Sequence, residues 1–139
     1  MHSHTLTPDT LPDLAAQVAA GGWTVACLCA AWCGTCDSYR HSFETLAARH
    51  PDLRFVWIDI EDQADIVGDL DIDNFPTLLI QHDELVAFFG TVLPDPALAE
   101  RLIAAQLSTS EADLARLAGS TEERRGWQRD GNLKTLLGV

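Results

Sequence analysis

Trp32-Cys33-Gly34-Thr35-Cys36 is the stretch that decides the fold, because it joins two segments of opposite character. Residues 23–30 before it are almost wholly apolar, which is typical of a short buried strand. Residues 33–49 after it predict a helix, with Tyr39, Phe43, Leu46 and Ala47 facing inward. The sequence therefore predicts a strand that passes directly into a helix, with two cysteines in the first helical turn.

Strands and helices alternate along the rest of the chain. Strands are expected at residues 3–6, 23–30, 53–60, 77–81 and 85–89, and helices at 7–18, 33–49, 62–69 and 94–107. Thr7 is expected to cap the first helix, with Pro8 at its first position. Because the last two strands are separated by a short polar turn, they predict a hairpin. The alternation predicts an α/β layered fold with a mostly parallel sheet.

Charge divides the chain in two. The net charge is −12, and residues 1–107 carry all of it, whereas residues 108–139 are neutral. We therefore expect a compact domain at 1–107 and a C-terminal helical extension at 108–139. A helix is expected at residues 111–118 behind Ser110, and a less regular one at 121–137. The extension is too apolar for a free linker, so we expect it to pack on its own chain or a second copy, with its basic residues setting where it lands.

The composition excludes several classes of partner. The negative charge argues against nucleic acid and anionic membranes, since both bind positive surfaces. No run approaches the roughly 20 apolar residues that span a bilayer. Residues 1–8 lack the pattern of a signal peptide, so a cytoplasmic location is expected. The sequence leaves the oligomeric state open.

Four cysteines, Cys27, Cys29, Cys33 and Cys36, lie within ten residues. This clustering points to redox chemistry or metal binding rather than to a scattered disulfide framework. Cys33, at the helix N-terminus, is the expected nucleophile, and Cys36 is expected to resolve the mixed disulfide. Cys27 and Cys29 share a strand face beneath the site, either as small core residues or as auxiliary thiols that trap or resolve the oxidised pair. A thiolate metal site built from all four stays open as an alternative.

Three segments in the right order resemble the thioredoxin family over residues 3–107. They are Trp32–Cys36, the strand Phe55–Ile60, and Phe75-Pro76-Thr77. The resemblance implies a three-layer α/β sandwich with a mixed sheet and a cis peptide bond before Pro76. It also implies a thiol–disulfide oxidoreductase that acts on protein disulfides through the Cys33–Cys36 couple. The expected substrate groove comprises Trp32, Gly34, Thr35, Phe75 and Pro76.

The resemblance also bears on cofactors and partners. We expect no metal and no cofactor beyond the redox-active disulfide, and the chain has no glycine-rich dinucleotide fingerprint. Electrons are then expected from a separate reductase or a thiol pool. One rival interpretation is an assembly or adaptor protein that binds a client through the groove and the tail. The other is the cysteine-cluster metal-binding protein.

The chain departs from the family pattern around the two cysteines. Cys27 and Trp57 replace a buried Asp–Lys pair, so we expect an apolar layer beneath the disulfide. Cys29 replaces a Trp, Thr35 replaces a Pro, and His41 replaces the proline that kinks the helix. The residues expected to modulate the site are therefore Cys27, Cys29, Trp57, Asp37 and His41.

Overall fold

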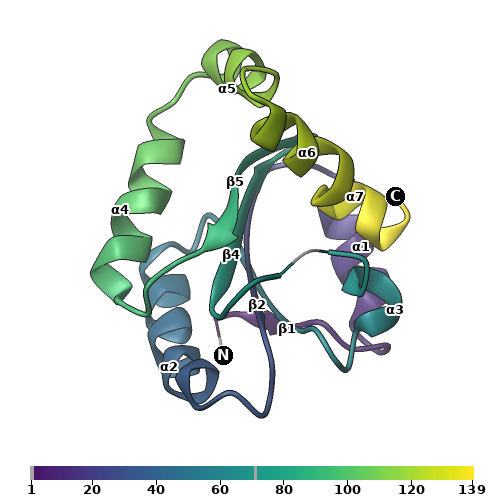
Figure 1. The fold of residues 1–139 in the computed structure, drawn as a ribbon, viewed down its shortest axis with the longest axis vertical. Coiled ribbons are helices and arrows are strands. Elements are labelled where there is room, and N and C mark those ends of the chain that lie inside the picture. Colours follow the sequence, from purple (N-terminus) through teal and green to yellow (C-terminus); the bar gives the residue numbers. More distant parts are fainter. Residues whose placement is uncertain (1, 71) are drawn as a thin grey trace.

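One five-stranded sheet organises the chain in a computed structural model, which describes residues 2–70 and 72–139 (Figure 1). Its strand order is β1-β3-β2-β4-β5. The strands are β1 (His4–Thr5), β2 (Trp23–Cys29), β3 (Arg54–Asp59), β4 (Thr77–His82) and β5 (Leu85–Thr91). Because β2 has β3 on one side and β4 on the other, the strand that ends at Cys29 lies at the centre of the sheet.

Two of the strand pairings are parallel and two are antiparallel. β3 pairs in parallel with both β1 and β2, whereas β4 pairs antiparallel with β2 and β5. The expected mixed sheet is confirmed, but the sheet is less parallel than the alternation of elements predicted. The tight turn at Asp83 and Glu84 makes β4 and β5 the expected hairpin, because only antiparallel neighbours can be joined so directly. The antiparallel pairing of β4 with the central strand β2 is the part that the alternation did not predict.

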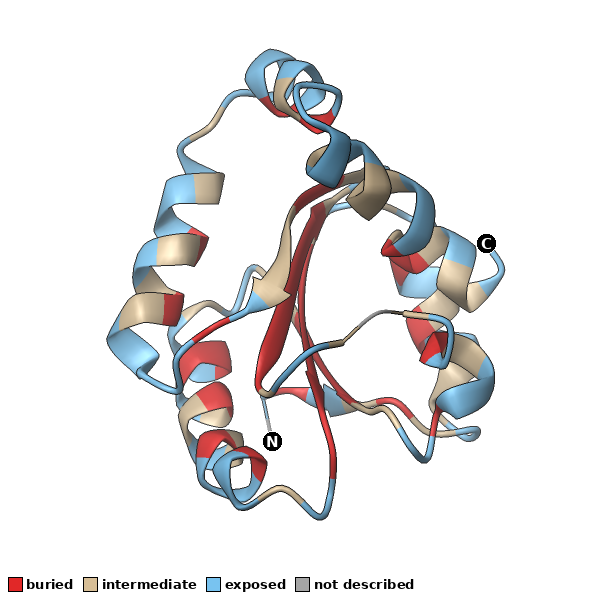
Figure 2. Ribbon diagram, viewed as in Figure 1, coloured by how far each residue is buried: buried red, intermediate tan, exposed pale blue. Residues whose placement is uncertain are grey.

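Helices cover both faces of the sheet and complete three layers (Figures 1 and 2). The helices are α1 (Leu11–Ala19), α2 (Gly34–Arg49), α3 (Ala64–Val67), α4 (Pro96–Leu107), α5 (Glu111–Ala118), α6 (Glu122–Asp130) and α7 (Leu133–Leu137). α2 and α4 share one core with the cysteine-bearing face of β2. α1, α3 and α7 share the core on the opposite face. None of the described helices has the length and apolar character needed to cross a bilayer.

Several element boundaries differ from those expected. α1 begins at Leu11 rather than after Thr7, because the Thr7 hydroxyl accepts a hydrogen bond from the Thr10 amide and closes a turn before the helix. α3 is limited to four residues. α4 begins at Pro96 because Asp95 caps it, accepting a hydrogen bond from the Ala97 amide. These shifts change the lengths of elements but not their order.

The C-terminal helices pack on the body of their own chain. α5 and α6 lie against β5, and α7 lies against α1 and α3 (Figure 1). Leu114 and Leu133 are buried, and Trp127 packs beside Phe88 with ring centroids 5.8 Å apart. The expected irregular segment at 121–137 is two helices, because Gly131 ends α6 and Asn132 caps α7.

Polar contacts fix the position of α6 and α7. The buried Gln81 side chain donates to Asn132 Oδ1 at 2.9 Å and accepts from the Leu133 amide at 2.8 Å. The Gln128 side chain accepts from the Val86 amide and donates to the Val86 carbonyl, both at 2.8 Å. A side-chain amide thus occupies the backbone groups of one residue of strand β5.

The basic residues of the extension contribute less to its placement than expected. Arg125 pairs with Glu122 and Arg129 with Asp130, so both pairs lie within the extension itself. Among the described residues, Lys134 makes the only ion pair of the extension with the body, at 3.8 Å from an exposed Glu84. Apolar packing and side-chain amides, rather than charge, therefore set where the extension lies.

Candidate functional site

The site lies where β2 passes into α2. Cys33 is the N-cap residue of α2, with extended backbone dihedrals, and its amide donates to the Ala30 carbonyl at 3.1 Å. Its carbonyl accepts from the Asp37 amide at 3.2 Å, which starts the helix. Cys33 is half-buried, whereas Cys36, one turn further on, is only 2% exposed. The two sulfurs expected to react are thus in different environments, one accessible and one enclosed.

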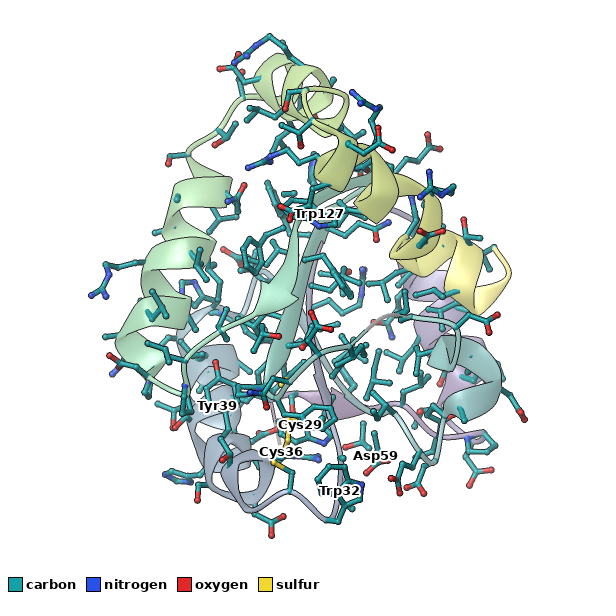
Figure 3. The ribbon with its side chains drawn as sticks, in the orientation of Figure 1. Cys29, Trp32, Cys36, Tyr39, Asp59 and Trp127 are labelled. Carbon is teal, nitrogen blue, oxygen red and sulfur yellow. A yellow bond between two sulfur atoms is a disulfide. The ribbon has the colours of Figure 1, made fainter. Side chains whose placement is uncertain are left out.

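Cys36 is bonded to Cys29 rather than to Cys33 in this structure (Figure 3). The Cα atoms of Cys29 and Cys36 are 5.8 Å apart, which is an ordinary separation for a disulfide. Cys33 is a free thiol. The expected Cys33–Cys36 pairing is therefore not the one recorded. Cys29 can reach Cys36 because it ends β2 on the face that α2 covers.

Cys27 lies one pleat earlier on the same face, and its sulfur is 3.8 Å from that of Cys29. It is fully buried. Burial raises the pKa of the Cys27 thiol, and the positive charge of Arg40 offsets only part of that effect. Cys27 therefore keeps its proton at neutral pH and is a poor nucleophile.

Two of the expected groove residues, Trp32 and Phe75, contact each other, and Trp32 directly precedes Cys33 in the chain. Trp32 is 67% exposed, its indole N–H donates to Glu61, and its ring meets Phe75 edge-on at 5.6 Å. The Phe75–Pro76 peptide bond is cis, as expected. Gly34 and Thr35 are also exposed, whereas Pro76 is buried. An exposed aromatic wall therefore stands beside the accessible thiol.

Arg40 is a residue of the site that the sequence analysis missed. Its guanidinium lies 4.6 Å from the centroid of the Trp57 ring and donates to the Thr5 hydroxyl. Cys36, Arg40, Trp57 and Asp59 line one cavity of about 220 Å³. The layer beneath the disulfide is apolar at Cys27 and Trp57, as expected, but a cation stands at its edge.

The other expected modulating residues, Asp37 and His41, are both exposed on α2. Asp37 also lines the cavity of about 220 Å³. Tyr39 instead lies in the core, and its buried hydroxyl has no hydrogen-bond partner among the residues that the structure describes. Burial raises the pKa of Tyr39, and the negative charges of Cys27 and Asp95 act in the same direction. The sequence analysis expected Tyr39 to face inward on this helix, and its burial confirms that expectation.

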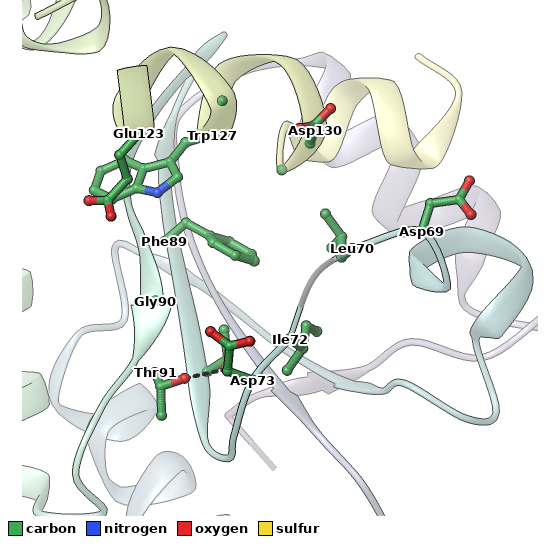
Figure 4. Close-up of a pocket in the computed structure, with 13 residues that line it drawn as sticks. Asp69, Leu70, Ile72, Asp73, Phe89, Gly90, Thr91, Glu123, Trp127 and Asp130 are labelled. Atoms are coloured by element: carbon green, nitrogen blue, oxygen red, sulfur yellow. Dashed lines mark hydrogen bonds between the residues drawn. The ribbon is translucent and has the colours of Figure 1, made fainter. Parts of the chain in front are cut away.

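A second cavity, of about 360 Å³, lies between α6, β5 and the segment before β4 (Figure 4). Phe89 and Trp127 form its apolar wall, and its rim is acidic. The acidic residues that line it are Asp69, Asp73, Glu123 and Asp130. None of the predicted groove residues lines it, although Thr77, next to Pro76, does.

Comparison with known proteins gives the family. The thioredoxin family profile matches residues 11–102. Putative thioredoxin 2 of Streptomyces coelicolor is 33% identical over 72 residues, which cover 51% of this chain and 54% of that protein. The chain therefore spans about half the length of that relative.

Solved structures share the fold. Poplar thioredoxin h superposes with a TM-score of 0.68 at 21% identity, covering 79% of this chain and all of that one. Thioredoxin f2, solved in complex with ferredoxin:thioredoxin reductase, gives 0.64 at 20% identity, covering 76% and 96% of the two chains. With the family profile matched over most of the chain and this fold around the two cysteines, the chain belongs to the thioredoxin family.

Proposed function

We propose that this protein is a thiol–disulfide oxidoreductase that acts on protein disulfides through Cys33 and Cys36. The Cys33 thiolate attacks one sulfur of a client disulfide and releases the other as a thiolate. Cys36 then attacks the Cys33 sulfur, forms the Cys33–Cys36 disulfide and releases the reduced client. A separate reductase or a thiol pool returns the electrons, as the reductase complex of thioredoxin f2 suggests for this fold.

The observation that carries the proposal is the placement of Cys33. Cys33 is half-buried at the N-cap of α2, where unpaired amides and the helix dipole stabilise the negative charge of a thiolate. Trp32 and Phe75 supply an apolar surface beside it for an extended client segment. An accessible thiol next to an enclosed one is what attack followed by resolution requires.

The rival functions receive less support from the contacts. The tail that an adaptor would use for a client is packed against β5 and α1 of its own chain. A four-thiolate metal site would require the Cys29–Cys36 bond to open first. The dithiol chemistry also requires reduction of the Cys29–Cys36 bond, which frees Cys36, but it leaves the tail where it lies and needs no further ligand.

Reduction of insulin by dithiothreitol, followed by turbidity, tests the activity. We expect the wild-type protein to shorten the lag before precipitation, and Cys33→Ser to behave like buffer. Ser38→Ala, on the exposed surface of the same helix, is the matched control and should match the wild type. A Cys33→Ser variant as active as the wild type would disprove the assignment.

Brief alkylation of the reduced protein gives a second readout. Iodoacetamide at neutral pH should label Cys33 first, because Cys27, Cys29 and Cys36 are each no more than 2% exposed. Mass spectrometry locates the label. Labelling that falls mainly on a buried cysteine would contradict the assignment of the nucleophile.

A further inference from the structure

We propose that Cys29 is a third redox residue, which displaces Cys33 from Cys36 and stores the oxidised state as a buried Cys29–Cys36 disulfide. This inference rests on the proposed function, since that function generates the Cys33–Cys36 disulfide on which Cys29 acts. Its consequence is an oxidised protein in which the attacking thiol, Cys33, is free again.

The geometry brings Cys29 and Cys36 together from two rigid elements. Cys29 is held by β2 in the centre of the sheet, paired with Asp59 of β3. Cys36 is held by the first turn of α2. Their Cα atoms are 5.8 Å apart, and both residues are at most 2% exposed. The bond therefore joins fixed, enclosed positions without a loop that must move to close it.

Cys36 is consequently a shared partner. It lies on the helix that Cys33 begins, three positions after it, and it faces the strand that Cys29 ends. Cys33 and Cys29 reach it from the solvent side and the core side respectively. A thiol with two possible partners allows a disulfide to move between them without any external oxidant.

The exchange balances in atoms and electrons. The Cys29 thiolate attacks the Cys36 sulfur of the Cys33–Cys36 disulfide, the Cys29–Cys36 bond forms, and the Cys33–Cys36 bond breaks. Cys33 leaves as a thiolate and takes up the proton that Cys29 released. The protein is neither oxidised nor reduced in this step, because the two electrons stay on the three sulfurs.

Two features favour the buried disulfide as the end point. The leaving group, Cys33, is at the helix N-terminus, which stabilises a departing thiolate. In the product, Cys29 is part of a disulfide and no longer carries a free thiol within the apolar layer that it forms with Cys27 and Trp57. Cys27, one pleat earlier on the same strand, is a free thiol in this structure, and Cys36 is bonded to Cys29.

Peptide mapping separates the two disulfides. We would equilibrate the full-length protein in a glutathione redox buffer, quench it with acid, and block free thiols with N-ethylmaleimide in denaturant. Chymotrypsin cleaves after Trp23, Trp32 and Tyr39. Cys33 and Cys36 therefore lie in one peptide, residues 33–39, and both Cys27 and Cys29 lie in the peptide before it, residues 24–32, so the Cys27→Ala variant assigns the link to Cys29. A Cys29–Cys36 bond links two peptides, whereas a Cys33–Cys36 bond lies within one.

We expect the linked peptides as the predominant oxidised species, with N-ethylmaleimide on Cys33. Cys27→Ala is the matched control, since it removes a neighbouring buried thiol and should keep the link. Cys29→Ala should convert the population to the internal Cys33–Cys36 bond. Wild-type protein with only the internal bond, and with the label on Cys29, would overturn the proposal without any variant having to fold.

Cys33→Ser distinguishes the two proposals from each other. Oxidation of this variant should still consume two thiols and yield the linked peptides, although insulin reduction is lost. A linked peptide without turnover in the wild type would refute the proposed function and leave only the Cys29–Cys36 disulfide, formed without exchange. Turnover with no linked peptide would refute the exchange alone.

Discussion

Three residues at the base of the site, Cys27, Trp57 and Arg40, set its electrostatics. Cys27 and Trp57 place no charge there, and both belong to the buried core. Arg40 brings a guanidinium over the Trp57 ring, and its positive charge acts on Cys27. An uncharged Cys27 beneath the pair and a cation at its edge favour thiolates, and hence the reduced form. Asp37 and Asp59, which line the same cavity as Arg40, act against them.

The first prediction concerns the reduction potential of the Cys33–Cys36 couple. Cys29→Ala isolates this couple, and we expect its potential to be less negative than the roughly −270 mV of thioredoxin. The reason is that a stabilised thiolate makes the disulfide easier to reduce. A glutathione titration, read by alkylation and mass, measures it. A midpoint at or below thioredoxin's value would contradict this account of the electrostatics.

The second prediction concerns alkaline pH. In the unfolded chain the Cys27 thiol loses its proton near pH 9, whereas in the native state burial raises its pKa above that value. The stabilisation is therefore complete below about pH 9 and is lost as pH rises above it. We expect oxidised wild-type protein to lose about 1 kcal/mol more unfolding free energy between pH 8 and 10 than Cys27→Ala does. Urea denaturation at both pH values measures the difference.

The comparison between the two proteins controls for other groups. Tyr39 and the surface residues titrate in both, so only the Cys27 contribution differs. Equal losses in wild type and variant would mean that the buried thiol does not titrate with unfolding.

The sequence predicted where the four cysteines lie better than which of them are bonded. Local spacing placed Cys33 and Cys36 at the start of the helix, and strand alternation placed Cys27 and Cys29 on the face beneath them. The contact between Cys29 and Cys36 depends on how closely α2 approaches β2, which no local pattern encodes. Arg40 was missed for the same reason, since its role depends on Trp57 of a different strand.

At the scale of elements, the order of strands and helices followed from apolar periodicity, and their ends did not. Thr7 and Pro8 form a plausible helix start, yet Thr7 serves a turn instead and α1 starts at Leu11. Capping signals are local, and several can compete for the start of one helix. A long apolar run such as residues 23–30, by contrast, is buried most simply as a central strand. The extension was predicted to pack, but the side-chain amides that position it were not.

The third prediction tests what holds the extension. Leu133, at the start of α7, is 2% exposed and packs in the core with α1 and α3. We expect Leu133→Ala to lower the free energy of unfolding by about 2–5 kcal/mol. Leu107→Ala, at the 39% exposed end of α4, is the matched control and should change it by less than about 0.5 kcal/mol. Chemical denaturation of both variants provides the values.

Equal effects of the two substitutions would show that the extension contributes nothing to the stability of the body. A further comparison, Lys134→Gln, removes the ion pair of the extension with Glu84. Because that pair is exposed, its loss should cost well under about 1 kcal/mol.

At the scale of the whole molecule, a net charge of −12 surrounds the site. Glu61 holds the indole of Trp32, and Asp37 lies on the exposed side of α2. The cavity beside Thr77 adds four acidic side chains near the same end of β4. Such a field attracts cationic clients and repels anionic ones over distances set by ionic strength.

The fourth prediction follows from this field. Reduced protein should react faster with cystamine, a dication, at low salt than at high salt, and the reverse should hold for the dianion 3,3′-dithiodipropionate. Each probe is compared with itself, so differences in leaving group cancel, and the neutral bis(2-hydroxyethyl) disulfide is the control. Stopped-flow rates across a salt series provide the test. Rates of all three probes that change in parallel would exclude steering.

Strand β5 forms one edge of the sheet, and the outward-facing backbone of such a strand is a template on which another polypeptide can add. Gln128 occupies the amide and the carbonyl of Val86 there, with two hydrogen bonds that imitate a neighbouring strand. The Gln128 side chain thus blocks the addition of another strand at Val86. Gln128→Ala would reopen that position, and self-association into β-rich assemblies would then become the characteristic failure of this chain on storage or overexpression.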